Sequence, residues 1–221
     1  MILSLLEQID AHHPLVPLDI GAWRRVKVNG MTFSIRAYHA DGLGRVSVMT
    51  ASGMLGLMKM ETLIVNPTEK DLPLYSYDRI RALGNDTLII ELYDTQLAPV
   101  HTRPLSVAKA LYARLPERDP GVHWYDAMKL PESVSKKGKT ADTHALSRLA
   151  SDFTAAYLRL NGESVAEPGA KRAKAAVYVD GLLEKGGPAT DPFLKALGPK
   201  ATAELFRTVL FDTAAAEETA E

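Results

Sequence analysis

Residues 60–97, METLIVNPTEKDLPLYSYDRIRALGNDTLIIELYDTQL, contain two short apolar runs joined by a proline-containing connection. The first run is Leu-Ile-Val at 63–65, and the second is Leu-Ile-Ile at 88–90. Short apolar runs between turn residues are typical of buried β-strands. Glu61 lies beside the first run and Asp94 follows the second. We therefore expect two neighbouring strands, each delivering one carboxylate to a shared pocket suited to proton transfer.

The residues before this segment continue the strand pattern. The expected strands are Trp23–Val28, Met31–His39, Val46–Thr50, Leu55–Val65 and Thr87–Tyr93. Asn29-Gly30 lies between the first two, and an Asn-Gly pair between alternating runs is the strongest short-range signal for a hairpin. Turns this short require antiparallel strands, because a parallel pair needs a crossover of about a dozen residues.

Helical periodicity flanks the strands on both sides. Residues 2–11 carry apolar side chains at helical spacing. The later helices are expected over Leu105–Leu115, Thr143–Leu160, Ala170–Glu184 and Thr202–Phe211, with a Pro-, Gly- and Lys-rich excursion over 116–140. Strands followed by helices indicate an α+β fold, in which helices cover the faces of an antiparallel sheet. We expect one domain over 1–221, with a helix and lead-in over 1–20 and a disordered tail over 213–221.

Composition narrows the classes of function. The 221-residue chain is 46% hydrophobic, which supports a large core, and its net charge of −1 gives no electrostatic support for nucleic-acid binding. It has no cysteine, which excludes disulfides, thiolate metal sites and cysteine nucleophiles. No apolar run approaches the about 18 residues of a membrane span, and the N-terminus lacks the pattern of a signal peptide. We expect a cytoplasmic monomer with neither nucleic acid nor membrane as a partner.

Two separated stretches resemble the ferredoxin-dependent bilin reductases, the family of the phycocyanobilin, phycoerythrobilin and phytochromobilin reductases. In residues 60–97 a strand, an Asp-Leu-Pro turn at 71–73 and a further Asp precede a second strand. In residues 178–212, YVDGLLEKGGPATDPFLKALGPKATAELFRTVLFD, a Tyr-led helix, a polar break and two helices close on Leu-Phe-Asp. The order and separation of the two stretches agree with the family's layout over most of residues 23–212.

The resemblance implies both a fold and a chemistry. The family folds as a three-layer α/β/α sandwich around a central antiparallel sheet. Its members reduce a linear tetrapyrrole, usually biliverdin or a partly reduced bilin, and bind no flavin, nicotinamide or metal. Electrons arrive one at a time from reduced 2Fe–2S ferredoxin. We therefore expect this chain to catalyse ferredoxin-dependent reduction of a bilin without a cofactor of its own.

The resemblance also implies site residues. Asp94 falls at the family's catalytic aspartate if the chain has a two-residue insertion before it, and is the expected main proton donor. Glu61, or Thr62 if the register shifts by one, lies near a position that holds histidine or asparagine in the family. Met49 replaces a carboxylate found in some members. Asp191 lies in a polar break where some members carry an acid, although it also suits a helix N-cap.

Cations are expected to hold the two propionates of a bilin and to attract ferredoxin, which is acidic. The propionate candidates are Arg36, Arg45, Lys59, Arg79 and Arg81. The docking candidates are Lys136, Lys137 and Lys139, or Lys171, Arg172 and Lys174. Asp78, by contrast, is expected at a turn or helix start with a structural role. No pair of histidines has metal-ligand spacing, so no metal site is expected.

Two functions of different classes stay open. The first is an enzyme that reduces a bilin, or in a variant another open-chain tetrapyrrole such as a chlorophyll catabolite, the substrate of a related family with this fold. The second is a tetrapyrrole carrier with weak or no catalysis. The departures from the family pattern at Glu61, Met49 and Asp191 keep the carrier under consideration.

Overall fold

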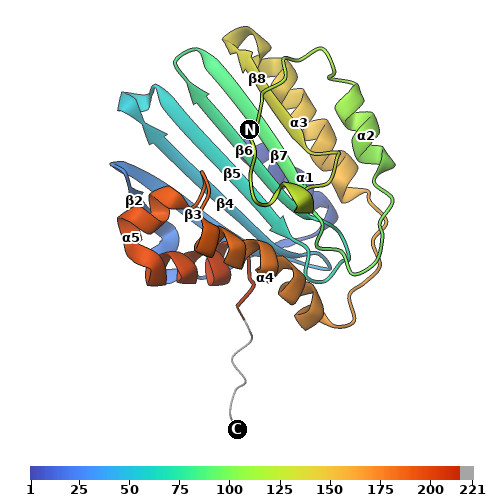
Figure 1. Ribbon diagram of the computed structural model, residues 1–221. Helices are drawn as coiled ribbons and strands as arrows, with labels where there is room; N and C mark the ends of the chain where they lie inside the picture. The colour runs from blue at the N-terminus through green and yellow to red at the C-terminus, as the bar shows by residue number, and fades with distance from the viewer. Residues whose placement is uncertain (215–221) are drawn as a thin grey trace.

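The computed structural model describes residues 1–214, which form one eight-stranded sheet with helices on its faces (Figure 1). The strands are β1 (Leu15–Pro17), β2 (Arg25–Val28), β3 (Met31–Ala40), β4 (Gly44–Gly53), β5 (Met58–Asn66), β6 (Leu74–Ala82), β7 (Asn85–Tyr93) and β8 (Val134–Lys139). The α-helices are α1 (Ile2–His12), α2 (Arg103–Ala110), α3 (Thr143–Leu158), α4 (Pro168–Lys185) and α5 (Asp191–Glu204). A π-helical segment, Leu205–Leu210, continues α5, and short 3-10 turns occupy Gly21–Arg24, Met54–Gly56, Asp126–Met128 and Thr140–Asp142.

All strand pairings are antiparallel, as the short turns predict. The order across the sheet is β1-β3-β4-β5-β6-β7-β8, and β2 also pairs with β3. From β3 to β7 each strand pairs with the next along the chain, because a short connection joins each pair. The last strand, β8, joins the sheet after a long excursion that includes α2.

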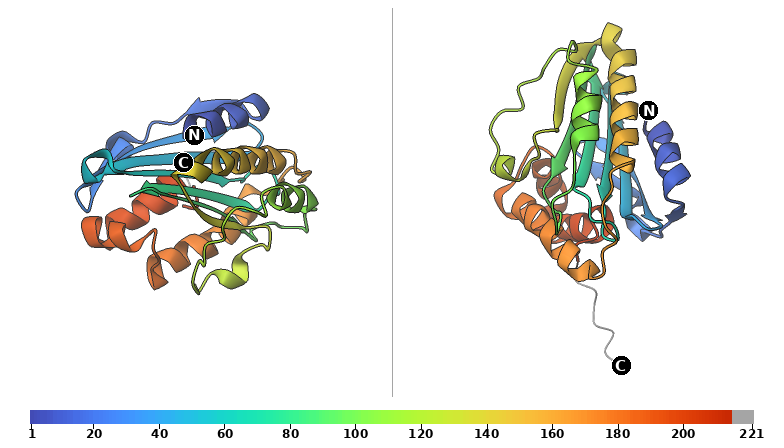
Figure 2. Two further views of the ribbon diagram at one scale, coloured as in Figure 1. Left: turned by 90° about the horizontal axis from the view of Figure 1, so that it is seen from above. Right: turned by 90° about the vertical axis from the view of Figure 1, so that its right-hand side faces the viewer.

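Helices cover both faces of this sheet and give the molecule three layers (Figure 2). One apolar core lies between the sheet and the helices α1 and α3, and a second lies between the sheet and α4, α5 and the π-helical segment. The α+β fold, with an α/β/α sandwich around a central antiparallel sheet, is confirmed. Because strand residues alternate, Leu63 and Val65 face the first core and Ile64 faces the second.

The sequence pattern fails to predict β1, β6 and β8. Residues 71–78 carry a turn pattern, yet β6 begins at Leu74, directly after Pro73. Proline is tolerated at the start of a strand, where its missing N–H costs the ladder nothing. The expectation that Asp78 lies at a turn or helix start is therefore wrong, since it lies inside β6, paired with Thr62 of β5 and Ile89 of β7.

At the ends of the chain, α1 and β1 occupy most of the lead-in expected over 1–20. The tail expected over 213–221 lies, from residue 215 onward, outside the described residues. No helix within residues 1–214 has the length and apolar composition of a membrane span.

Candidate functional site

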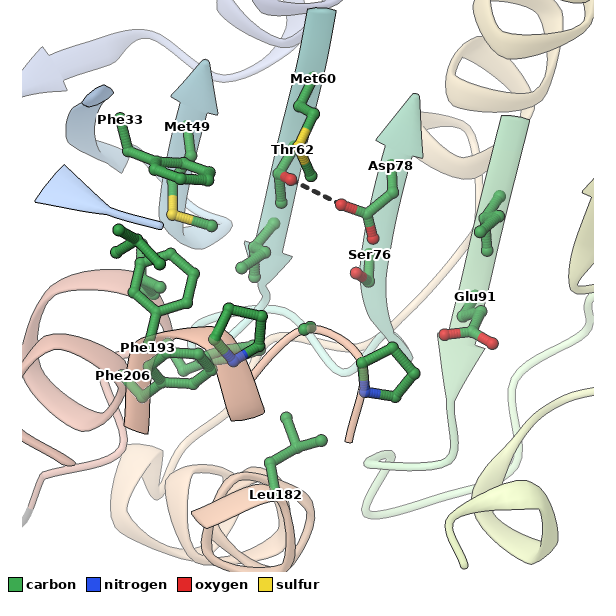
Figure 3. Close-up of a pocket in the computed structure, with 18 of the residues that line it drawn as sticks. Phe33, Met49, Met60, Thr62, Ser76, Asp78, Glu91, Leu182, Phe193 and Phe206 are labelled. Carbon is green, nitrogen blue, oxygen red and sulfur yellow. Dashed lines mark hydrogen bonds between the residues drawn. The ribbon is translucent and has the colours of Figure 1, made fainter. Parts of the chain in front are cut away.

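A cavity of about 350 Å³ lies between the central strands and the layer formed by α4, α5 and the π-helical segment. Its apolar wall includes Met49, Met58, Met60, Phe193, Phe206 and Phe211. Its polar lining includes Thr62, Ser76, Asp78, Glu91, Arg118 and His123. Figure 3 shows the strand side chains and the helical side chains facing each other across this space. A volume of this size, mostly apolar with a few convergent polar groups, is typical of a small-molecule site.

One rung of the sheet supplies the centre of the cavity wall. Met49 of β4 pairs with Thr62 of β5, Thr62 pairs with Asp78 of β6, and Asp78 pairs with Ile89 of β7. All four residues line the cavity. Since directly paired residues on neighbouring strands point to the same face, the pairing alone brings these side chains together.

Asp78 is the acid with the most perturbed environment in this wall. Its Oδ1 accepts a hydrogen bond of 2.5 Å from the Thr62 hydroxyl (Figure 3). The pKa of Asp78 is raised to about 6: burial against the apolar cavity is the largest cause, the Thr62 hydrogen bond opposes it, and the negative charge of Glu91 adds to it. Within residues 1–214 Asp78 forms no ion pair.

Glu91 supplies a second carboxylate from the next strand. It pairs with Ser76 of β6, two residues from Asp78, and it points into the same cavity (Figure 3). Its Oε2 accepts a 2.6 Å hydrogen bond from the Tyr93 hydroxyl, and its Oε1 lies 3.4 Å from Lys129 Nζ. Glu91 therefore has an ammonium group and a phenol as partners, whereas the partner of Asp78 in the described part of the chain is a hydroxyl.

Two carboxylates in different environments can take different roles in one site. A carboxyl group with a pKa near 6 holds its proton in part of the population near neutral pH and can release it to a bound molecule. Asp78 is thus suited to act as a general acid. Two neighbouring strands do each deliver an acid to one pocket, but these strands are β6 and β7 and the acids are Asp78 and Glu91. The two strands expected to be neighbours, β5 and β7, are separated by β6.

The acids predicted from the resemblance lie elsewhere. Asp94 is exposed beyond the end of β7 and lines a separate surface hollow beside Gln96, so the prediction that it reaches the pocket is wrong. Glu61 lies on the opposite face of β5, 3.9 Å from the N-terminal ammonium and 3.7 Å from Arg81, because it is one residue out of phase with Thr62. The alternative register, with Thr62 facing the pocket, is the one that the structure has.

Asp191 is exposed at the first residue of α5 and does not line the cavity. Its Oδ1 accepts a 2.9 Å hydrogen bond from the Gly187 backbone N–H, four residues earlier. Asp191 therefore closes the turn that leads into the helix. This role is structural, as expected for a cap, but the N-cap of α5 is Thr190. Its prediction as a catalytic acid is not supported by its position.

None of the predicted propionate-binding cations lines the cavity. Arg36 and Lys59 are exposed away from it, and Arg45 pairs with Asp212 at 3.1 Å. Arg79 and Arg81 lie on the opposite face of β6, where they pair with Asp86 and Glu61. They lie there because odd-numbered residues of β6 point away from Asp78.

The two predicted docking clusters are only partly on the surface. Lys136 is buried, and its Nζ donates to the Leu115 carbonyl at 3.0 Å and to Glu117. Lys171 is fully buried, and its Nζ donates to Asp71 at 3.0 Å. Neither lysine can contact a protein partner. The remaining members are Lys137, Lys139 and Lys174, which are exposed, and Arg172, which is partly exposed and paired with Asp212.

The Asp-Leu-Pro turn has the anchoring role that its position suggests. Asp71 accepts hydrogen bonds from the backbone N–H groups of Leu97 and Ala98, both at 2.8 Å, in addition to Lys171. These contacts fix the start of β6 against the end of β7 and against α4. They set the register that presents Asp78, although the turn itself does not touch the cavity.

Sequence patterns could have identified the missed site residues that lie on strands. Ser76 and Asp78 alternate with Tyr75 and Tyr77, which is the signal of a strand with two different faces. In β7, Glu91 likewise alternates with the apolar residues Ile90 and Leu92. The cationic lining residue Arg118 and the neighbouring His123 come from the irregular connection before β8, and no periodic signal marks them.

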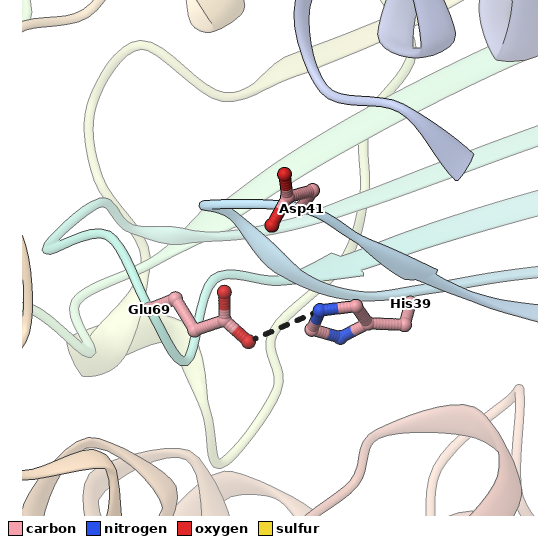
Figure 4. A group of neighbouring side chains, drawn as sticks. All are labelled: His39, Asp41 and Glu69. Carbon is pink, nitrogen blue, oxygen red and sulfur yellow. Dashed lines mark ion pairs between the residues drawn. The ribbon is translucent and has the colours of Figure 1, made fainter. Parts of the chain in front are cut away.

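The fold also gathers a group that the sequence spacing does not predict. His39, Asp41 and Glu69 place their ligand atoms within 4.8 Å of one another at the β3–β4 turn (Figure 4). His39 Nε2 lies 3.5 Å from Glu69 Oε1, and Glu69 Oε2 accepts from the Gly42 N–H at 3.1 Å. These contacts join two exposed connections of the sheet, apart from the cavity.

No protein-family model matches the sequence, and no curated protein matches it at a significant level. Among solved structures, the fold matches phytochromobilin synthase from tomato, which was crystallised in complex with biliverdin. The TM-score is 0.74, the match covers 96% of this chain and 82% of that chain, and the sequence identity is 14%. The chain therefore shares the three-layer fold of phytochromobilin synthase, which is the fold that its resemblance to the bilin reductases implies.

Proposed function

We propose that the protein reduces a linear tetrapyrrole, biliverdin or a related bilin, with electrons from ferredoxin and with Asp78 as the main proton donor. The observation that carries this proposal is the partly buried Asp78, which faces an apolar cavity, has no cationic partner within residues 1–214 and has a pKa raised to about 6. The sequence resemblance to the bilin reductases and the shared fold with a biliverdin-bound synthase support the choice of substrate.

The chemistry requires a positioned acid. Each electron added to a bilin raises the basicity of its nitrogens, carbonyl oxygens and vinyl carbons, so a proton must follow the electron. Asp78 supplies that proton from the cavity wall, and Glu91 raises the proton affinity of Asp78 through its charge. Electrons come from the external donor.

Substrate carboxylates need a cation, and Arg118 is a cationic lining residue in the described part of the chain. We assign one bilin propionate to Arg118, because a guanidinium pairs well with a carboxylate. The ferredoxin docking surface is assigned to Arg172 and Lys174 of α4, since α4 also carries Tyr178 and Leu182 in the cavity wall. A donor bound there lies close to the substrate.

A two-step spectroscopic experiment tests the proposal. Biliverdin is first titrated with the protein, and an absorbance shift is expected on binding. Reduced ferredoxin is then added under anaerobic conditions, and loss of the biliverdin spectrum with formation of a new product is expected. A shift without later conversion would leave the carrier function, and the absence of any shift would exclude both functions.

A further inference from the structure

Three hairpin tips lie at one end of the sheet, and two of them carry leucine at a position that suits asparagine. In the β2–β3 tip, Asn29 has a φ of 49° and precedes a glycine. The β4–β5 and β6–β7 tips repeat this backbone with Leu55, φ 55°, and Leu83, φ 51°, each followed by a glycine with positive φ. Asn and Gly adopt positive φ readily, whereas it strains leucine.

The leucines at these tips are also exposed. The relative exposure is 106% for Leu55, 70% for Leu83 and 65% for the neighbouring Leu57. Neither backbone preference nor packing within the fold explains a leucine at these positions. A single exposed leucine is common, but a group of them on a strained backbone is typical of a binding surface.

The register of the sheet brings the two tips together. Met58 pairs with Gly53 on one side and with Ala82 on the other, so both tips are at the same end, about 10 Å apart at the usual strand spacing. Figure 1 shows these tips along one edge of the molecule. Leu57 and Leu83 line one shallow hollow. The leucines therefore form one surface, which we name the leucine end.

Positive charge surrounds the leucine end. Lys59, Lys137 and Lys139 are exposed, and within residues 1–214 they form no ion pair. Of the acids close to this end, Asp86 and Glu61 each have a cationic partner, and Asp142 accepts a 2.8 Å hydrogen bond from the backbone N–H of Lys139. The surface thus combines projecting apolar side chains with unpaired lysines, which complements a partner that is anionic outside and apolar inside.

We propose that the leucine end docks the protein on an anionic membrane surface, a partner that the sequence alone does not predict. The leucines enter the boundary between headgroups and acyl chains, and the lysines contact anionic headgroups. A protein partner fits less well, because protein interfaces are depleted in lysine and leucine is under-represented among their hot spots. The cavity reaches the same end through Asn29, Met31 and Met58, so a docked protein presents the cavity to apolar molecules in the bilayer. The docking does not depend on the proposed tetrapyrrole chemistry.

Vesicle co-sedimentation of the full chain tests this proposal. We expect binding to phosphatidylcholine vesicles that contain phosphatidylserine, weaker binding at high salt, and little binding to phosphatidylcholine alone. The double variant Leu55→Asn/Leu83→Asn gives both tips the residue that the β2–β3 tip already uses. It should keep the melting temperature of the parent protein or raise it, while the vesicle partition coefficient falls at least about tenfold.

Two further variants serve as controls. Val16→Asn removes an exposed apolar side chain at the opposite end of the sheet and should leave vesicle binding unchanged. Replacing Lys59, Lys137 and Lys139 with glutamine should weaken binding to anionic vesicles only. The proposal is overturned if the parent protein does not bind anionic vesicles or if the leucine double variant binds as well as the parent. Binding to an acidic protein without binding to vesicles would also overturn it.

Discussion

Both faces of strands β6 and β7 carry carboxylates, but a carboxylate on one face is ion-paired and a carboxylate on the other face is not. Toward α3, Arg79 and Asp86 form a bidentate pair, with Nε–Oδ1 at 2.8 Å and Nη2–Oδ2 at 2.7 Å, and both are buried. Toward α4 and α5, Asp78 and Glu91 line a cavity, and Asp78 receives its hydrogen bond from a neutral hydroxyl. Residues adjacent in sequence, Asp78 and Arg79, thus belong to different environments.

The pKa values of the two aspartates distinguish a structural carboxylate, Asp86, from a candidate functional one, Asp78. Burial raises the pKa of Asp86, but hydrogen bonds from Arg79 and Thr143 outweigh it and hold that pKa below its usual range. At Asp78 burial prevails and the pKa rises to about 6. A buried carboxylate without a cation destabilises a fold, so its presence in an apolar cavity indicates a functional site.

The largest expected effect is the loss of turnover in Asp78→Asn. Removing a general acid lowers the rate by about 10²–10⁴-fold, and the bilin should still bind because the apolar wall is intact. Anaerobic turnover and bilin titration measure the two quantities separately. Turnover at the parent rate would show that Asp78 is not the donor.

The next effect is the loss of stability in Arg79→Met. The change leaves Asp86 buried without its partner and should lower the free energy of unfolding by about 3–5 kcal/mol. Urea unfolding measures this value. The double variant Arg79→Met/Asp86→Asn is the matched control and should recover part of the loss, whereas equal losses in both variants would argue against the ion pair as the cause.

A pair of variants should move the pH dependence of turnover in opposite directions. Glu91→Gln removes a negative charge that raises the pKa of Asp78, and Thr62→Val removes a hydrogen bond that lowers it. Because the acid must be protonated, turnover falls as pH rises through its pKa. The fall should therefore occur at lower pH in Glu91→Gln and at higher pH in Thr62→Val. Shifts in the same direction would contradict this assignment.

A smaller effect is expected on stability as a function of pH. The pKa of Asp78 is raised from 3.8 to about 6 on folding, so its ionisation opposes folding, and its contribution to the stability of the parent is lost as pH rises from 3.8 to about 6. Asp78→Asn does not titrate. Its advantage in melting temperature should grow by roughly 5–10 °C between about pH 4 and about pH 7, as calorimetry can measure. A constant difference would mean that the pKa is not raised.

The smallest effects belong to the acids outside the cavity. Asp94→Asn and Glu61→Gln should change turnover by less than about twofold, since neither side chain touches the cavity wall. The same turnover assay tests both variants. A large loss in Asp94→Asn would restore the role that the sequence resemblance implies for it.

Strand alternation explains what the sequence could and could not predict. The antiparallel sheet, α1, α3 and α4 follow from local periodicity and turn residues, because those signals lie within each element. The pocket acids depend on the register between strands. Because residues 71–78 carry a turn pattern, the sequence assigns the main pocket acid to Asp94 instead of Asp78. A one-residue uncertainty in β5 leaves both Glu61 and Thr62 as candidates for one pocket position.

Buried cations were equally hidden from the sequence. Lys136 and Lys171 lie in sequence clusters that are typical of an exposed basic surface. Both are buried, however, and each donates hydrogen bonds to carbonyl and carboxylate oxygens from distant parts of the chain. Those partners come from connections that have no periodic pattern. Arg118 reaches the cavity from a connection of the same kind.

The most direct test compares the titration of the two aspartates by carbon NMR of their carboxyl groups, assigned with Asp78→Asn and Asp86→Asn. Asp78 should titrate near pH 6 and Asp86 below the usual range of an aspartate, since one faces the cavity and the other is paired with Arg79. An Asp78 carboxyl that titrates in the usual range, or at the same pH as Asp86, would contradict the assignment of the cavity face as the catalytic one.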